Sequence, residues 1–220
     1  MASSAFQISA LLLAFLSLIL LLVATVSNYW KTSNKAATLI TANWIYEGLW
    51  MNCVATSMGS VQCKEFFSLL SLETYIQACR ALMITSLILG MCGTLLTLLG
   101  LKCTQLGSNS ENTKSRIAML GGMIFILAGL SSMVAISWYA ERITAQFFDS
   151  LYGGTKFELG YALYLGWAGS LLSMLGGGFL TCSACKEKHR DYKYAATQHG
   201  KDARIYIKQS ETVTSAKDYV

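Results

Sequence analysis

The seven cysteines are the side chains of this 220-residue sequence with the most evident chemistry. Nine residues separate Cys53 from Cys63, and a disulfide between them would close a loop of about 11 residues, worth about 3 kcal/mol of stability. Cys103, Cys182 and Cys185 lie at the ends of apolar segments, a position that suits S-palmitoylation, with a free buried thiol as the alternative. Cys182-x-x-Cys185 alone is too short a pattern to predict a zinc site.

No group of residues in the sequence has the pattern of a catalytic centre. The two histidines, His189 and His199, both lie in the polar C-terminal tail. No nucleophile with a suitable base and no metal-ligand cluster is evident beside them. We therefore expect that the protein is not an enzyme and that it needs no cofactor or metal.

Charged residues are sparse and unevenly placed, which predicts a membrane protein. They make up 13% of the chain, whereas about 25% is usual for a soluble domain. Four segments of at least 21 residues lack them altogether, and a helix of that length reaches about 32 Å, enough to cross a hydrocarbon core of about 30 Å. The first could instead be a signal peptide, but its apolar run exceeds the usual length of about 7–15 residues. The segments are Met1–Val26, Ala81–Leu101, Ile117–Tyr139 and Gly160–Cys182.

The distribution of Lys and Arg predicts the orientation of these four spans. Residues 102–116 contain three basic residues and residues 183–220 contain eight, against four in residues 27–80 and two in residues 140–159. The positive-inside rule places the two more basic segments in the cytoplasm. We therefore predict a cytoplasmic N-terminus at 1–5, spans at 6–26, 81–101, 117–139 and 160–182, extracellular loops at 27–80 and 140–159, a cytoplasmic loop at 102–116 and a cytoplasmic tail at 183–220.

The net charge of +5 lies mostly on the cytoplasmic side of this arrangement. Anionic lipid of the inner leaflet attracts such basic segments. Membrane lipid is therefore a sufficient partner for them, and we expect no nucleic-acid partner.

The first extracellular loop has the composition of a folded segment. Residues 38–46 alternate in polarity and are rich in β-branched and aromatic residues, and we expect two to five short antiparallel strands. Cys53 and Cys63 also lie in this loop, outside the cell, where disulfides persist. Phe66–Arg80 has apolar residues at helical spacing and predicts a short helix before the second span. The predicted fold is an all-α transmembrane four-helix bundle with a small extracellular antiparallel β-sheet from the first loop.

Seven residues of this loop stand at a distinctive spacing, namely Trp30, Gly48, Leu49, Trp50, Cys53, Cys63 and Arg80. Trp30 and Trp50 have amphipathic rings that suit the membrane interface, where they would seat the sheet against the outer leaflet. The arrangement resembles the claudin family, and within it the channel-forming members. The resemblance covers almost the whole chain. It includes residues 75–80, 136–140, 147–149 and 156–160 and the final residues 219–220.

The resemblance implies a function that the pattern alone does not. Claudins polymerise side by side in one membrane and meet their counterparts across the gap between two cells. The implied partners are therefore copies of this chain and other claudins, in cis and in trans, at the tight junction of the plasma membrane. It also implies that Leu69 docks on a neighbouring subunit and that Phe147 and Phe148 receive it. Exposed apolar side chains outside the membrane suit this role because they need a partner to cover them. The alternative is that the two Phe side chains pack on their own subunit's loop.

Charged residues of the first loop, by the same resemblance, select the ions that pass. Rings of acids favour cations and rings of bases favour anions. Glu47 and Glu65 match acidic positions of a channel-forming member, although Thr56 stands where that member has Asp. Lys35 and Lys64 match basic positions of an anion-selective member. We expect a charge-selective paracellular ion channel that favours cations, with an anion-selective channel and a sealing claudin as alternatives.

The C-terminus predicts a further partner. A PDZ domain binds the free carboxylate of a chain that adds a strand to its sheet. The chain ends in Tyr219 and Val220, as claudins do, which implies PDZ-domain scaffold proteins of the junction. A claudin-like auxiliary subunit of another membrane protein would keep the same fold, but this C-terminus and the pair Phe147 and Phe148 favour a claudin.

Overall fold

A computed structural model describes most of the chain outside residues 101–110 and 186–220. The described residues are 2–33, 44–56, 59–65, 73–100, 111–149 and 157–185, with side chains from residue 8 in the first helix and from residue 113 in the third. Several residues singled out above lie outside this set, namely Lys35, Leu69, Cys103, Tyr219 and Val220.

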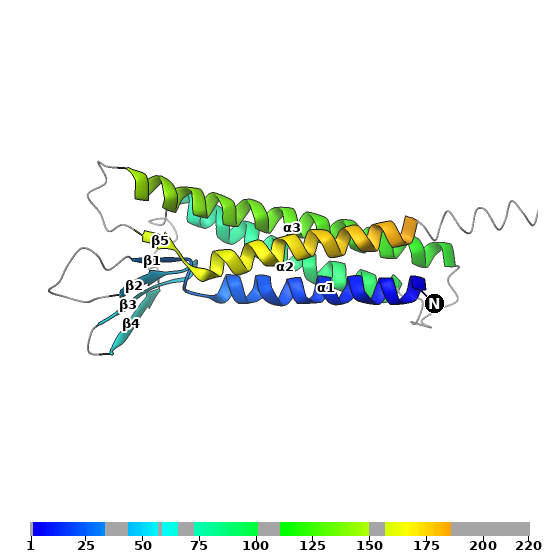
Figure 1. The fold of residues 1–220 in the computed structure, drawn as a ribbon, viewed down its shortest axis with the longest axis horizontal. Coiled ribbons are helices and arrows are strands. Elements are labelled where there is room, and N and C mark those ends of the chain that lie inside the picture. The colour runs from blue at the N-terminus through cyan, green and yellow to red at the C-terminus, as the bar shows by residue number, and fades with distance from the viewer. Residues whose placement is uncertain are drawn as a thin grey trace, which may run out of the picture.

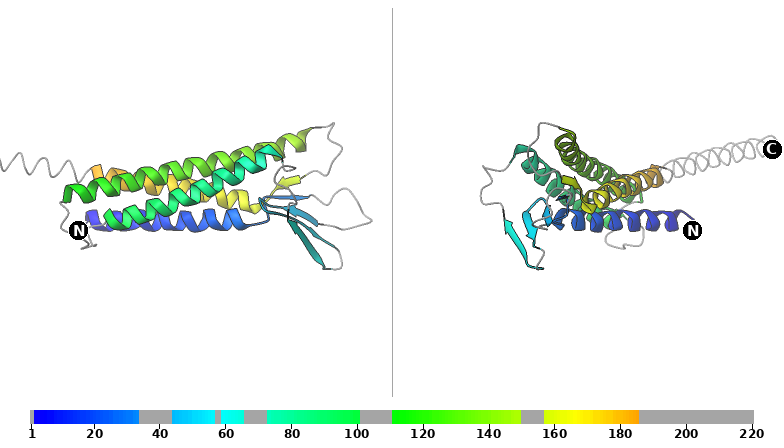
Figure 2. Two further views of the ribbon diagram at one scale, coloured as in Figure 1. Left: turned by 180° about the vertical axis from the view of Figure 1, so that it is seen from behind. Right: turned by 60° about the vertical axis from the view of Figure 1, so that its left-hand side comes forward.

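Four long helices lie side by side in one bundle (Figures 1 and 2). They are α1 (Ala2–Val26), α2 (Thr74–Gly100), α3 (Glu111–Phe148) and a fourth, unlabelled helix (Tyr161–Cys185). Each contains a stretch long and apolar enough to cross a membrane. The four predicted helices are therefore confirmed.

Two helices extend beyond the charge-free segments on the side that carries the sheet. α2 begins at Thr74, before the segment that starts at Ala81, and includes the end of the short helix expected at Phe66–Arg80. α3 continues past Tyr139 to Phe148. The absence of charge marks how far a helix can lie in lipid, whereas the helix itself continues into water wherever its backbone hydrogen bonds persist.

A five-stranded antiparallel sheet lies at one end of the bundle (Figure 1). Its strands follow the order β4-β3-β2-β1-β5. They are β1 (Lys31–Ser33), β2 (Trp44–Glu47), β3 (Met51–Ala55), β4 (Val61–Glu65) and β5 (Phe157–Leu159). The predicted sheet is confirmed, but one strand was missed, because β5 comes from the second extracellular loop and pairs with β1.

Small residues bring the helix backbones into close contact. A Cβ atom on Gly177 would lie 2.5 Å from the backbone oxygen of Gly122, so only glycine allows the fourth helix to approach α3 there. Serines add hydrogen bonds between helices, from Ser86 Oγ to the Ala128 oxygen at 2.8 Å and from Ser173 Oγ to the Phe125 oxygen at 2.9 Å. The close backbone approach and the hydrogen bonds between helices join these helices into one packed bundle.

The largest buried cluster lies where the sheet meets the bundle. Trp30 and Leu49 from the sheet side are fully buried, as are Met83 of α2 and Tyr139 of α3. The rings of Trp30 and Tyr139 meet edge to face at 4.9 Å. Sheet and helices therefore share one hydrophobic core.

Candidate functional site

The sheet is attached to α1 through two tryptophan side chains. The last carbonyl groups of a helix have no partner within the helix. Here Trp30 Nε1 donates to the Ala24 oxygen at 2.8 Å and Trp50 Nε1 donates to the Thr25 oxygen at 2.9 Å. Both tryptophans therefore satisfy carbonyls at the C-terminus of α1, which ends at Val26.

This arrangement corrects the expectation of an interfacial ring for Trp30, whose side chain is covered by protein. Trp30 is fully buried in the protein, and Trp50 is half-buried. The indole is amphipathic, as the interface would require, but its polar N–H binds a helix carbonyl and the ring of Trp30 packs in the shared core. The two indole hydrogen bonds hold the sheet on the bundle.

Arg80 joins the same corner of the sheet from α2. Its Nε donates to the Leu49 oxygen at 2.6 Å, and its guanidinium lies 5.0 Å from the centre of the Trp50 ring. A buried guanidinium is tolerated when its donors are used and an aromatic face is near. The contacts give Arg80 a structural role: it ties the turn between β2 and β3 to the start of α2.

Gly48 is required at this turn by close packing. A Cβ atom there would lie 2.6 Å from the Cα of Asn28 and 2.7 Å from the backbone oxygen of Ser27. Its backbone N–H donates to the Met51 oxygen at 3.0 Å, which closes the turn. The tripeptide Gly48-Leu49-Trp50 thus has three separate tasks: close approach, core packing and binding of the α1 carbonyl.

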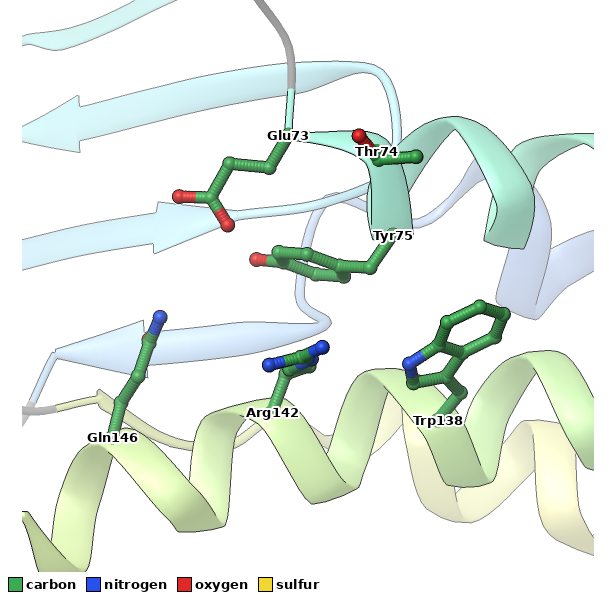
Figure 3. Close-up of a pocket in the computed structure, with 6 residues that line it drawn as sticks. All are labelled: Glu73, Thr74, Tyr75, Trp138, Arg142 and Gln146. Atoms are coloured by element: carbon green, nitrogen blue, oxygen red, sulfur yellow. The ribbon is translucent and has the colours of Figure 1, made fainter.

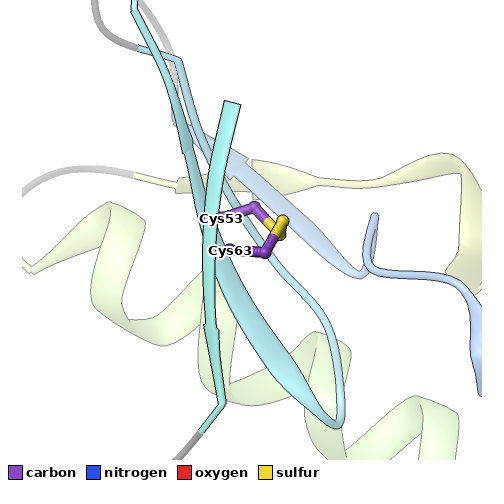
Figure 4. Close-up of a disulfide and its surroundings, with 2 residues drawn as sticks. All are labelled: Cys53 and Cys63. Atoms are coloured by element: carbon purple, nitrogen blue, oxygen red, sulfur yellow. A yellow bond between two sulfur atoms is a disulfide. The ribbon is translucent and has the colours of Figure 1, made fainter. Parts of the chain in front are cut away.

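The disulfide joins neighbouring strands. Cys53 of β3 and Cys63 of β4 are directly opposed in the sheet and are bonded through sulfur, as predicted (Figure 4). Thr56 lies at the end of this hairpin, where its hydroxyl hydrogen-bonds Ser60 Oγ at 2.5 Å. All five residues of β4 are exposed, so the disulfide and the backbone ladder fix the position of this edge strand.

A buried ion pair crosses the middle of the sheet. Lys31 Nζ of β1 lies 2.8 Å from Glu47 Oε2 of β2, and only about a tenth of either side chain is exposed, 10% and 11%. The same ammonium lies 4.7 Å from the centre of the Phe157 ring in β5. Glu47, one of the two acidic selectivity candidates, is thus bound to a partner in its own subunit.

The register of the strands places the charged candidates on different faces. One row across the sheet runs through Lys31, Glu47, Asn52 and Lys64. Directly opposed residues of antiparallel strands share a face, so Lys64 lies on the face of the ion pair. Glu65 follows it in β4 and therefore points to the opposite face, which carries the disulfide. Glu47 and Glu65 do not line the same surface of one subunit.

Tyr29, Tyr46 and Tyr161 form a stack that sequence reasoning did not find. The Tyr29 ring is stacked on Tyr46 at 4.4 Å and on Tyr161 at 5.1 Å between centroids. Burial, and then a hydrogen bond with Tyr46, raise the pKa of Tyr29 above its ordinary value. No sequence signal marks this stack, because its members come from three separate segments.

The outer end of α3 carries two neighbouring aromatic residues, of which Phe148 is exposed and Phe147 is half-buried. Phe148 is 82% exposed, and its ring meets that of Phe147 edge to face at 5.6 Å. Among the described residues, none covers the Phe148 ring to bury it in a core. At the opposite end of the bundle, Cys182 and Cys185 are exposed on the fourth helix.

The comparison with known proteins agrees with the spacing and with this geometry. The profile of the PMP-22/EMP/MP20/Claudin family matches residues 4–180. The chain belongs to this family. Among its relatives, claudin-15 of Mus musculus is 49% identical over 77% of this chain and 76% of its own length. Claudin-19 of Mus musculus is 43% identical over 86% and 85%, and claudin-1 of Rattus norvegicus is 39% identical over the whole of both chains.

Membership of the claudins gives the sheet and the bundle their setting. The protein is a membrane protein of the tight junction, where claudins associate with one another in strands. It is a structural protein of that junction and not an enzyme. Within the described part of the chain, no group of three or more His, Cys, Asp or Glu residues is placed to hold a metal ion.

Proposed function

We propose that this claudin assembles into strands with itself and other claudins and forms a charge-selective paracellular ion channel that prefers cations. The passage would run parallel to the two membranes and be lined by the extracellular sheets of neighbouring subunits. Ions would cross it down their gradients. Glu47, Thr56, Glu65, Lys35 and Lys64 are the residues whose charge or polarity would set its field.

The exposure of Glu65, while Glu47 is buried against Lys31, is the observation that carries the cation preference. Because the Lys31 ammonium and the Glu47 carboxylate are buried against each other, the exposed charges determine the electrostatic potential at the surface of the sheet. Glu65 is exposed on β4, an edge strand of the sheet, where a neighbouring subunit could bring a second copy of it close. We assign Glu65 the direct role and Glu47 the role of compensating the charge of the Lys31 ammonium within the sheet.

Lys64 favours a second candidate, an anion-selective channel. It is exposed on the same strand, on the opposite face from Glu65. The face that strand assembly turns toward the passage therefore decides the sign of selectivity. A sealing claudin would result if neither face lined an open passage.

Dilution potentials of NaCl across epithelial monolayers with few other claudins test the proposal. The chain should raise conductance with a cation-selective potential. Glu65→Gln should weaken that potential, and Lys64→Gln should strengthen it or leave it unchanged. Glu141→Gln, at an exposed acid that belongs to α3 and not to the sheet, serves as the charge-matched control and should have no effect.

Two other results would contradict the cation channel. An anion-selective potential that Lys64→Gln abolishes would mean that the face of the sheet carrying Lys64, and not the face carrying Glu65, lines the passage. A rise in resistance without selectivity would make the protein a barrier claudin.

We also propose partners at the cytoplasmic side. Tyr219 and Val220 would bind PDZ-domain scaffold proteins, and Cys103, Cys182 and Cys185 would be acylated, because they lie next to the membrane. The exposure of Cys182 and Cys185 supports acylation, since an enzyme must reach the thiol. Metabolic labelling with an alkyne-bearing palmitate should mark the wild-type chain and fail on the variant with all three cysteines changed to Ser.

A further inference from the structure

A cavity of about 520 Å³ lies between the outer ends of α2 and α3 (Figure 3). Six residues line it, namely Glu73, Thr74, Tyr75, Trp138, Arg142 and Gln146. The three from α3 are spaced four apart, so they lie on one side of that helix. None of the selectivity candidates that the structure describes is among these six.

The cavity brings opposite charges and aromatic rings together in one space. The carboxylate of Glu73 projects into it from the start of α2, and the guanidinium of Arg142 faces it from α3 (Figure 3). Arg142 Nε is 3.8 Å from a carboxylate oxygen of Glu141, and among the described residues the two terminal nitrogens of the guanidinium have no ion-pair partner, so they can serve a ligand. The rings of Tyr75 and Trp138 form the inner wall.

The position of the cavity along α3 matches the headgroup layer of the outer leaflet. The charge-free segment ends at Tyr139, directly after Trp138. Arg142 lies four residues beyond Trp138, about 6 Å farther out at 1.5 Å per residue, and Gln146 lies about 12 Å beyond Trp138. The headgroup region of one leaflet is about 5–8 Å deep, so Arg142 lies at the depth of lipid phosphates.

We propose that this cavity binds the headgroup of a zwitterionic phospholipid of the outer leaflet. The phosphate would bind Arg142 near the N-terminus of α2, whose partial positive charge adds to the attraction. The ammonium group would lie against Tyr75 with Glu73 beside it, because cations bind both carboxylates and aromatic faces. The acyl chains would pass Trp138 into the bilayer. Charges of both signs within one cavity match a zwitterion better than an anionic lipid.

Native mass spectrometry of the full-length protein in detergent tests this site, with no dependence on ion passage. The probes are phosphatidylcholine, phosphatidylglycerol and a diacylglycerol with the same acyl chains. The wild-type protein should retain phosphatidylcholine in preference to diacylglycerol. Arg142→Gln should lower that retention about fivefold, the scale of one half-exposed charged contact. Arg142→Lys keeps the charge and should recover part of it.

The second charge gives an effect of the opposite kind. Glu73→Gln leaves Arg142 as the main charge of the cavity, so the ratio of phosphatidylglycerol to phosphatidylcholine should rise. Arg116→Gln removes an exposed base at the other end of α3 and should leave phosphatidylcholine retention unchanged. Melting temperatures close to that of the wild-type protein would verify that each variant is folded.

Three outcomes would overturn the proposal. Equal losses in Arg142→Gln and Arg116→Gln would mean that lipid is retained by net charge alone. An unchanged lipid ratio in Glu73→Gln would remove the carboxylate from the site. Displacement of the lipid by free phosphocholine at equal concentration would identify a soluble zwitterion, and not a lipid, as the ligand.

Discussion

At the scale of single residues, the structure places acids of the first loop in different environments, a difference that the sequence does not reveal. Glu47 and Glu65 are both acids of the first loop, but Glu47 is buried against Lys31 and Glu65 is exposed on β4. A buried charge contributes little to a surface field once its partner is in contact. Its loss, however, leaves the partner buried and unpaired.

The pair of Lys31 and Glu47 therefore predicts a large difference between two conservative changes. Glu47→Gln leaves the Lys31 ammonium without its carboxylate and should lower the free energy of unfolding by about 2–4 kcal/mol. Glu65→Gln, at an exposed position, should change it by less than about 0.5 kcal/mol. Denaturant unfolding of the purified protein, followed by tryptophan fluorescence, measures both. Equal effects would mean that the pair contributes no more than a surface contact.

The hydroxyl group of Tyr139 predicts a change in the other direction. Tyr139 is fully buried, and its hydroxyl has no hydrogen-bond partner among the described residues. An unpartnered polar group in a core costs about 1–3 kcal/mol. Tyr139→Phe should therefore keep or raise the melting temperature, whereas Ile136→Ala, which opens a cavity in the same core, should lower it. A clear fall in Tyr139→Phe would reveal a bound water or another partner of the hydroxyl.

At the scale of secondary structure, the end of α1 determines where the sheet lies. Two indole N–H groups bind its carbonyls, while Arg80 connects the same turn to the start of α2. The three contacts join α1, the sheet and α2 within one corner. Their combination explains the spacing from Trp30 to Arg80 by geometry, because each residue must reach a fixed backbone atom.

The indole of Trp50 gives a test of this attachment. Trp50→Phe keeps an aromatic face for Arg80 but loses the hydrogen bond to the Thr25 oxygen, and should lower the free energy of unfolding by about 1–2 kcal/mol. Trp44→Phe, on the exposed side of β2, is the matched control and should change it by less than about 0.5 kcal/mol. Thermal unfolding by circular dichroism compares them. A loss in Trp44→Phe as large as in Trp50→Phe would argue against the carbonyl contact.

At the scale of the whole molecule, the end of the bundle that carries the sheet has two exposed features that suit contact with other subunits. Among the described strands, β4 lies at an edge of the sheet, and the outer end of α3 carries the exposed Phe148. Large exposed apolar groups of this kind mark interaction sites. They fit the association of claudins in strands.

Phe148 predicts a defect in assembly without a defect in folding. Its side chain is 82% exposed, so Phe148→Ala removes little buried area from the subunit and should leave the melting temperature within about 1 °C. Continuous strands in freeze-fracture images of transfected cells should become sparse or broken. Leu120→Ala, an exposed apolar residue nearer the other end of α3, should leave them intact. Normal strands in Phe148→Ala would exclude this side chain from the subunit contact.

The sequence by itself determined the four helices, the disulfide between Cys53 and Cys63 and the family. Long charge-free segments and a short cysteine spacing depend on local properties that any fold must respect. Only the tertiary structure decided that β5 joins the sheet, that Glu47 and Glu65 face opposite sides, and that Trp30 binds a helix carbonyl. Each of these depends on strand register or on contact between distant segments, and a shift of one residue in register would reverse the faces.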